Sequence, residues 1–446
     1  MTEPSGGRAV EARALSRFDL LALGVNGVVG SGVYLLLGPM AEKAGAASIL
    51  ATVACAGMCL LVALCFAELS SMFREDGGAY VYGRAAFGKT VGFVVGWMSL
   101  VEGVVAFAAV AVGFGAALGA LVPALAGSGK SAASAVVLIA GFSALNYRGV
   151  KAGARTVDLL SVLKVLPLLV LALVGLAHLS PAVLPAILKE TRHPLHAGGF
   201  GEATFLAAFM LSGFEYTAVP AGAARNPERA IPRALVASLL IATALYVVLQ
   251  GVLLSVLPDV GRSAQPLPEL ATRLFGPLGG RVMALAAIVS MAGFCAGSAL
   301  VGPRYVTALA EGGYLPAGLS AQSRFKTPGR GIFVSAVTAS LLAVFVNFDA
   351  LVDIGTLALF AQYLPASLAV PVLRWKRPQA PRGVCVPGGP YGVPILAAAA
   401  SVALLMVSHP QLAEWKVAGV VLGLGAVVWG LTVLSRGHRP GSGHLR

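Results

Sequence analysis

Charged residues are scarce in this chain of 446 residues, where Asp, Glu, Lys and Arg together make up 11%. Soluble domains average about 25% charged residues, so this composition argues against a soluble globular protein. Hydrophobic residues reach 57%, and apolar runs recur from one end of the sequence to the other. A helix needs about 20 apolar residues to cross the hydrocarbon core of a bilayer. The composition therefore predicts an all-α membrane protein.

The residue types of metal and catalytic sites are also few. The five cysteines form no CxxC pair, and three of them share one apolar run, which favours structural thiols over a disulfide or zinc framework. All six histidines fall in loops or at the ends of apolar segments. We therefore expect no enzyme activity, no catalytic residues, no metal and no cofactor.

Twelve apolar segments can be assigned along the chain. The first has no small-residue cleavage site and is too long for the apolar part of a signal peptide, so it is expected to be a retained span. The fourth and ninth are short and the third is long. The segments cover residues 18–40, 46–72, 91–125, 132–147, 156–180, 202–222, 231–257, 279–310, 331–347, 350–373, 391–408 and 415–435.

The basic residues fall mostly on one side of this arrangement. When the loops are assigned alternately to two sides, twenty-three of the 32 Lys and Arg residues lie on the side of the N-terminus and eight on the other. Because Lys and Arg are enriched in cytoplasmic loops, we expect a multi-pass protein of the cell (inner) membrane with both termini in the cytoplasm. The net charge of +13 is spread over many loops, whereas a nucleic-acid-binding surface would gather in one domain. Membrane lipids, and no nucleic acid, are the expected large-scale partners.

Two of the segments are interrupted near their middle. Gly30-Ser31-Gly32 interrupts the first segment and LSGFE, at residues 211–215, interrupts the sixth, at an offset of 181 residues. Irregular backbone at bilayer depth is tolerated only where it is buried in protein or lines a polar cavity. Paired interruptions in corresponding positions of two halves indicate the binding site of a secondary transporter. Chance glycines, or close helix packing through small residues, are the alternatives.

Unwound helices would expose groups that match the two ends of an α-amino acid. Free N–H groups at the start of a second half-helix, at the positive end of its dipole, suit a carboxylate. Carbonyls of Val28 and Val29 would suit an ammonium group, and the break at Ser212 and Gly213 offers the same groups in the opposite orientation, with the Phe209 carbonyl nearby. A small-molecule L-amino acid is therefore the expected substrate.

A few charged residues lie deep within apolar segments. Lys164 lies inside the fifth segment, and an ammonium buried in hydrocarbon costs about 3 kcal/mol on insertion scales, so it should face the protein interior unless it snorkels to an interface. Since burial disfavours the charged amine, Lys164 is a candidate proton carrier. Glu102 and Glu215 are also deep, and Glu215 is better placed to cap or orient the broken helix than to touch substrate. Glu68 favours a role as a packing hydrogen-bond acceptor over one as a gate.

Five motifs occur in order along residues 18–390. They are LGVNGVVGSGVYLLLG, AELSSMFREDGGAYVYGRAAFG, the stretch 97–102 with the following AVAVGF, FMLSGFEYTAVPAGAARNPERAIPRAL, and IGTLALFAQYLPASLAVPVLRWKRP. Together they resemble the amino acid–polyamine–organocation (APC) superfamily of transporters and, more narrowly, its cationic-amino-acid-transporter-like branch. The match around the sixth segment is the most specific.

The resemblance implies twelve transmembrane helices in a LeuT-like fold, with a 5+5 inverted repeat, broken helices 1 and 6, and two extra helices. Its expected divisions are a cytoplasmic tail at 1–16, the first repeat at 17–180, an extracellular loop at 181–201, the second repeat at 202–373, a cytoplasmic loop at 374–390, the extra helix pair at 391–435, and a cytoplasmic tail at 436–446.

The resemblance also implies roles for individual residues. The GSG backbone would bind the carboxylate and nearby carbonyls the amine, while the helix 5 lysine would stand in the place of a sodium ion. Asn26 and Ser212 depart from the apolar residues that are commoner there, which leaves side-chain specificity open. The implied substrate-binding residues are Val28, Gly30, Ser31, Gly32, Phe209, Ser212, Gly213 and Ser298; those for proton coupling are Lys164 and Glu102; and those for the structure or gating of helix 6 are Glu215 and Phe209, the latter as an aromatic lid or a packing residue.

The expected function is secondary active amino acid transport by alternating access, with proton-coupled, sodium-independent uptake. An amino acid exchanger of the same fold, with Lys164 as a fixed charge, is the alternative. A more remote alternative is a polytopic membrane protein that is not a transporter.

Overall fold

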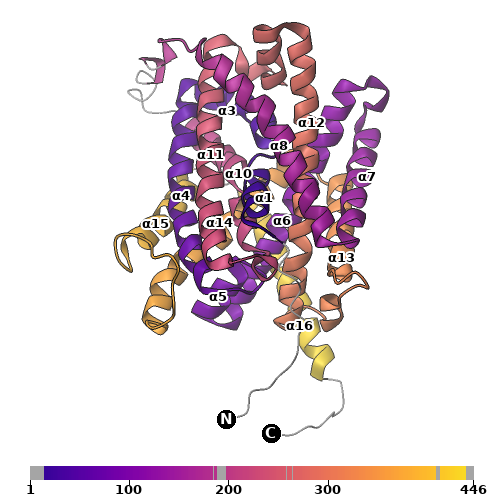
Figure 1. Ribbon diagram of the computed structural model, residues 1–446, viewed down its shortest axis with the longest axis vertical. Coiled ribbons are helices and arrows are strands. Elements are labelled where there is room, and N and C mark those ends of the chain that lie inside the picture. The colour runs from indigo at the N-terminus through magenta and orange to yellow at the C-terminus, as the bar shows by residue number, and fades with distance from the viewer. Residues whose placement is uncertain are drawn as a thin grey trace.

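The computed structural model describes residues 15–183, 185–187, 197–257, 259–263, 265–407 and 412–437. Within these ranges all regular secondary structure is helical, apart from one isolated bridge between Leu15 and Ala224. Most helices run along the long axis of one bundle, with α5 at one end and α3 near the other (Figure 1). The longer helices are α1 (Arg17–Val28), α3 (Leu37–Ala44), α4 (Ser48–Met72), α5 (Ala79–Phe87), α6 (Lys89–Leu121), α7 (Ser128–Tyr147), α8 (Val150–Leu176), α10 (Ala197–Leu211), α11 (Pro227–Val256), α12 (Pro266–Glu311), α13 (Gly329–Phe345), α14 (Phe348–Lys376), α15 (Gly392–Val407) and α16 (Leu412–Gly437).

Among the described residues, nine helical stretches are long and apolar enough to cross a membrane, and α13 and α15 are shorter apolar helices. The expected all-helical membrane class is confirmed. Helix α8 shows how the chain is adapted to lipid: Leu159, Leu166 and Leu173 are at least 57% exposed, whereas Lys164 is fully buried. The exposed face is apolar and the charged side chain is buried, which reverses the pattern of a helix on a soluble protein.

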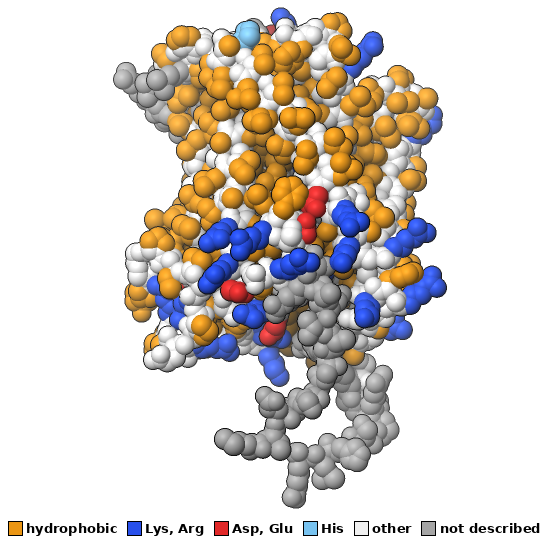
Figure 2. Space-filling model, viewed as in Figure 1, with side chains coloured by type: hydrophobic (Ala, Val, Ile, Leu, Met, Phe, Trp, Pro, Cys, Tyr) orange, Lys and Arg blue, Asp and Glu red, His pale blue; other side chains and the backbone are white. Residues whose placement is uncertain are grey.

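The charged side chains gather toward one end of the bundle. On the face shown in Figure 2, Lys and Arg are concentrated near the end that carries α5, and most of the remaining height is apolar. This is the distribution that the alternating loop assignment predicts for one membrane side.

The first predicted break is present. Helix α1 begins with a capping box, in which Ser16 Oγ accepts from the Asp19 N–H (3.2 Å) and Asp19 Oδ2 accepts from the Ser16 N–H (2.7 Å). It ends at Val28, and a short helix α2 (Gly32–Leu35) begins after the interruption. Leu36 has helical angles (φ −105°, ψ −18°) and joins α2 to α3. The two halves of the first segment are therefore separated at the GSG sequence.

The second predicted break is present as well. Helix α10 ends at Leu211, and Gly213 takes a left-handed conformation with φ of 102°, which residues with a Cβ rarely adopt. The chain then continues through two short 3₁₀ helices, η3 (Phe214–Ala218) and η4 (Ala221–Ala223), before α11. The second half of the sixth segment is therefore a series of tight turns instead of an α-helix.

The two interruptions, which are far apart in sequence, cross in space. A Cβ added to Gly27 would collide with the carbonyl oxygen of Gly213, and one added to Gly213 would collide with the carbonyl oxygen of Gly27. A Cβ on Gly32 would lie 3.0 Å from the Met210 Cα. The backbones approach this closely only because glycines meet at the crossing.

Candidate functional site

Lys164 ties α8 to the end of α1. Its ammonium group donates to the Asn26 carbonyl oxygen (2.9 Å) and to the Val29 carbonyl oxygen, and the side chain is fully buried. A cation at the C-terminal end of a helix also interacts favourably with the helix dipole. The side chain does not snorkel to an interface, because its charged end is held at the break.

The other carbonyls at this end of α1 are also engaged by the protein. Tyr246 of α11 donates its hydroxyl to the Val28 carbonyl oxygen (2.9 Å), which accepts from the Gly30 N–H as well (2.9 Å). Ser290 of α12 donates to the carbonyl oxygens of Gly30 (2.9 Å) and Val29 (3.3 Å). A carbonyl oxygen has two lone pairs, so the two acceptor positions of the Val28 oxygen are filled.

The N–H groups on the far side of the break have no such partners. The backbone N–H groups of Ser31, Gly32 and Val33 make no hydrogen bond to any described residue, and the Ser31 Oγ is likewise unpaired. Ser31 is 1% exposed and its two neighbours are buried. Unpaired buried N–H groups are rare in native proteins, and a run of them at a helix start is suited to an anion.

The second break is capped by its own acidic residue. Both carboxylate oxygens of Glu215 accept from the Gly213 N–H (3.1 Å each), and Tyr363 of α14 donates its hydroxyl to the Glu215 Oε2 (3.0 Å). Glu215 is 1% exposed. These contacts place Glu215 in the capping position that the sequence suggests.

Carbonyl acceptors at the second break are only partly used. The Phe209 carbonyl oxygen accepts from the Ser212 hydroxyl (2.8 Å) and from the Ser212 N–H (3.3 Å). The Ser212 carbonyl oxygen accepts no hydrogen bond within the described part of the chain. Among the carbonyls of Val28, Phe209 and Ser212, which are expected to meet an amine, the Ser212 carbonyl is therefore the one with both acceptor positions open.

Two further predicted residues, Phe209 and Ser298, lie around the crossing. Phe209 is 8% exposed and faces Gly355 of α14, whose added Cβ would lie 3.6 Å from the Phe209 ring. Ser298 of α12 is buried with an unpaired Oγ, and the preceding Gly297 faces Asn26 of α1. The structure thus surrounds the two breaks with α8, α12 and α14.

Glu102 of α6 lies beside η3. Its Oε1 accepts from the Tyr216 hydroxyl at 3.4 Å, and its Oε2 has no hydrogen-bond partner among the described residues. The Tyr216 ring packs against Phe294 of α12, and an added Cβ on Gly30 would lie 3.0 Å from that same phenylalanine ring. Glu102 is therefore connected to the first break through two aromatic side chains.

Sequence reasoning did not single out Tyr246 and Ser290, or the bond from the Asn26 amide to the Gly293 carbonyl oxygen (2.8 Å). Their only sequence signal is a polar side chain in an apolar run, which is common in membrane helices. Among the described residues, no group of three or more His, Cys, Asp or Glu side chains is placed to hold a metal ion.

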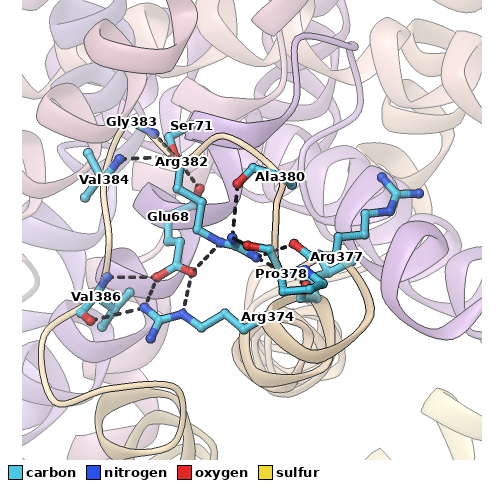
Figure 3. A network of polar contacts seen from close by, with 11 residues as sticks. Glu68, Ser71, Arg374, Arg377, Pro378, Ala380, Arg382, Gly383, Val384 and Val386 are labelled. Carbon is cyan, nitrogen blue, oxygen red and sulfur yellow. Dashed lines mark hydrogen bonds and ion pairs between the residues drawn. The ribbon is translucent and has the colours of Figure 1, made fainter.

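Glu68 belongs to a different network, near the end of α4 (Figure 3). Its Oε1 accepts from the Arg374 Nε (2.8 Å), its Oε2 accepts from another Arg374 nitrogen, and Arg382 forms an ion pair with it at 3.4 Å. The Val386 N–H also donates to the Glu68 Oε2 (2.8 Å). Glu68 therefore fastens the loop after α14 to the end of α4.

Comparison with known proteins agrees with this arrangement. The model of a family described as amino acid permease matches residues 15–431. The methylthioribose transporter of Bacillus subtilis (strain 168) is 28% identical over 409 residues, covering 87% of this chain and 86% of the relative. The branched-chain amino acid permease BcaP of the same strain is 28% identical over 437 residues, covering 92% of each chain. Its serine/threonine exchanger SteT is 29% identical over 392 residues, covering 85% of this chain and 87% of the relative.

These matches confirm the resemblance to the APC superfamily that the five motifs indicated. They run from the start of α1 into α16, and so include both breaks and the residues around them. This chain belongs to the amino acid permease family and is a multi-pass membrane transporter.

Proposed function

We propose that this permease takes up an amino acid together with a proton, without sodium, by alternating access. The observation that carries the proposal is the set of buried N–H groups at residues 31–33, which have no partner in the described part of the chain and lie directly beside the crossing of the two broken segments. A substrate carboxylate bound there would satisfy donors that the protein leaves free.

We further propose twelve spans in a LeuT-like arrangement. The nine long apolar stretches, the shorter α13 and α15, and the interrupted α10 together supply them. The first repeat would cover residues 17–180 and the second 202–373, each opening with a broken helix, and the pair at 391–435 would be appended. The gathering of Lys and Arg near α5 (Figure 2) supports cytoplasmic termini and a location in the inner membrane.

The amine of the substrate would be held mainly by the Ser212 carbonyl. The carbonyls of Val28 and Phe209 already carry protein donors, so they would contribute by their dipoles more than by direct bonds. Gly30 and Gly213 keep side chains out of the crossing. Phe209 and Ser298 would bound the space for the substrate side chain, with Phe209 closing over it.

Lys164 would connect protonation to movement of α1. In its charged form the ammonium group bonds two carbonyls of the helix end, and these carbonyls are ligands that a cation such as sodium would otherwise use. Loss of the proton removes the charge-assisted part of both bonds and frees the end of α1 to move. Glu102, with one oxygen unpaired, would be the second proton carrier.

Uptake of labelled amino acids into proteoliposomes tests this proposal. Wild-type protein should accumulate substrate faster under an inward proton gradient and be indifferent to sodium. Lys164→Ala should lose the acceleration by the gradient, whereas Lys130→Ala, which removes an exposed lysine bonded to the Ala124 carbonyl, should keep it. Gradient-independent uptake by the wild type, or undiminished coupling in Lys164→Ala, would refute proton coupling through this residue.

The names of two relatives indicate which compounds should be screened as substrates. BcaP is named for branched-chain amino acids, whereas the methylthioribose transporter is named for a compound of another class at the same identity. Thermal unfolding in detergent with each of the twenty amino acids and with methylthioribose would identify ligands, since a ligand of the folded form raises Tm. A shift by methylthioribose alone would overturn the amino acid assignment.

Amino acid exchange is the second candidate, favoured by the similarity to the exchanger SteT. An exchanger needs unlabelled substrate inside the vesicle, and a symporter does not. Uptake that disappears from empty vesicles would select exchange, with Lys164 as a fixed charge.

A further inference from the structure

A cavity lies between α7 and α13, lined by residues other than those at the crossing of the breaks. Its volume is about 690 Å³, within the range of small-molecule sites, which is about 300 to 1,000 Å³. Small residues such as Ala140 and Ala144 line it from α7, and larger apolar ones such as Phe333 and Leu341 from α13. Phe333 is 69% exposed and Leu341 53%, so the cavity is a groove that opens to the surroundings of the bundle.

Two arginines line the same cavity at one end. Arg148 directly follows α7, and Arg324 lies in the loop before α13. Neither forms an ion pair with any acidic residue that the structure describes. By contrast, Arg84, Arg304 and Arg374 are each paired with a carboxylate. The groove therefore ends in two positive charges that no described carboxylate neutralises.

The loop that carries Arg324 is fixed to α7. The Thr327 hydroxyl donates to the Tyr147 carbonyl oxygen (2.9 Å), and the Phe325 ring meets the Tyr147 ring edge-on, with centroids 5.8 Å apart. The Arg324 guanidinium carbon lies 4.7 Å from the centre of the Phe325 ring. Stacking of this kind orients a guanidinium group while leaving its N–H donors free for an anion.

We propose that this groove binds an anionic phospholipid, with its phosphate on Arg148 and Arg324 and an acyl chain along the apolar groove between α7 and α13. A guanidinium group can bond two phosphate oxygens at once, and basic pockets between membrane helices are suited to anionic lipid head groups. The combination of unpaired arginines at one end and an apolar, outward-opening groove matches both parts of such a lipid. The site is independent of the transported substrate.

Native mass spectrometry of the full chain in detergent tests the proposal. The protein is titrated with phosphatidylglycerol or with phosphatidylcholine of the same acyl chains, at one ionic strength, and bound lipid and oligomeric state are read from the same spectra. Wild-type protein should bind phosphatidylglycerol at least tenfold more tightly than phosphatidylcholine.

The variants separate the head group from the acyl chain. R148Q/R324Q should weaken phosphatidylglycerol binding about 30-fold. It should weaken phosphatidylcholine binding by much less, because the choline cation offsets the phosphate charge of that lipid, so the preference for phosphatidylglycerol should be lost. R229Q/R233Q removes the same charge from exposed arginines near the start of α11 and should stay within twofold of wild type. A140F/A144F, which fills the α7 side of the groove, should weaken the binding of both lipids.

Equal binding of the two lipids by the wild type would overturn the proposal. A phosphatidylglycerol preference that survives in R148Q/R324Q would also overturn it. Both arginines are exposed and have no ion-pair partner among the described residues, so their replacement should not disturb folding. This variant therefore tests the site even if A140F/A144F fails to fold. If the wild type forms a dimer without bound lipid and A140F/A144F abolishes that dimer, the groove would instead be an interface with a second copy of the chain, which would also overturn the proposal.

Discussion

The crossing of the two broken segments makes the smallest substitution a severe one. Gly213 has a φ of 102°, and a Cβ added there would meet the carbonyl group of Gly27 at a distance that real Cβ atoms do not show. A left-handed residue with a Cβ costs about 1 to 2 kcal/mol. Overpacking of a rigid contact adds about 1 to 3 kcal/mol. Gly213→Ala should therefore lower the free energy of unfolding by about 2 to 5 kcal/mol.

Gly27→Ala tests the steric contact between Gly27 and Gly213 without the cost of a left-handed backbone conformation. Gly27 lies within α1, and replacing a helical glycine by alanine ordinarily gains up to about 1 kcal/mol. A loss of stability at this position would therefore come from the collision with the Gly213 carbonyl. Because both substitutions disturb one contact, the double variant should lose less than the sum of the two single losses.

The assay is thermal unfolding in detergent, followed by uptake in proteoliposomes. Gly57→Ala is the matched control, because Gly57 lies in α4 and an added Cβ there meets nothing within 4 Å. The control should keep or raise the wild-type Tm, while Gly27→Ala and Gly213→Ala should lower it and abolish uptake. Wild-type Tm and uptake in Gly213→Ala would refute the crossing as the framework of the site.

Two further outcomes follow from the buried carboxylates. Glu68→Gln leaves Arg374 and Arg382 without their shared partner and should cost about 3 kcal/mol, whereas Glu75→Gln, which breaks an exposed pair with Arg84, should cost less than about 1 kcal/mol in the same unfolding assay. Equal losses would contradict the fastening role of Glu68. Glu215→Gln replaces one acceptor oxygen by an amide that cannot accept from Gly213 or Tyr363, and should lower the free energy of unfolding by about 1 to 3 kcal/mol. In Tyr363→Phe the further loss caused by Glu215→Gln should be smaller, and additive losses would show that the two side chains act separately.

The positions of both breaks could be predicted because their causes are local. Gly-rich interruptions weaken a helix wherever they occur, and at bilayer depth they imply a buried or polar surrounding. The structure ends α1 at Val28 and α10 at Leu211, within the interrupted motifs. Lys164 was predictable on similar grounds, since a lone ammonium inside an apolar run must find acceptors in the protein.

The partners at the breaks were not predictable, because they come from distant segments. Tyr246 and Ser290 lie more than 200 residues from the carbonyls that they bond, and nothing local marks either as different from other polar residues in membrane helices. The Gly27–Gly213 contact is equally invisible in sequence, where the two glycines belong to different segments. The 3₁₀ turns in the second half of the sixth segment were not predicted either; the Gly213 N–H that precedes them donates to the Glu215 carboxylate.

The two sides of the first break differ in which backbone groups already have hydrogen-bond partners. Around the first break the carbonyls are bonded by Lys164, Tyr246 and Ser290, while the N–H groups at residues 31–33 have no partner among the residues that the structure describes. The protein therefore supplies one cation and two hydroxyl donors on the carbonyl side, and we propose that the N–H side is left for an anionic ligand. Under the proposed function, a substrate would be recognised first by its carboxylate, and its amine would be left with the acceptor at Ser212 on the opposite segment. Such a ligand bonds both broken segments at once, so its binding and release would be coupled to the relative movement of α1 and α10.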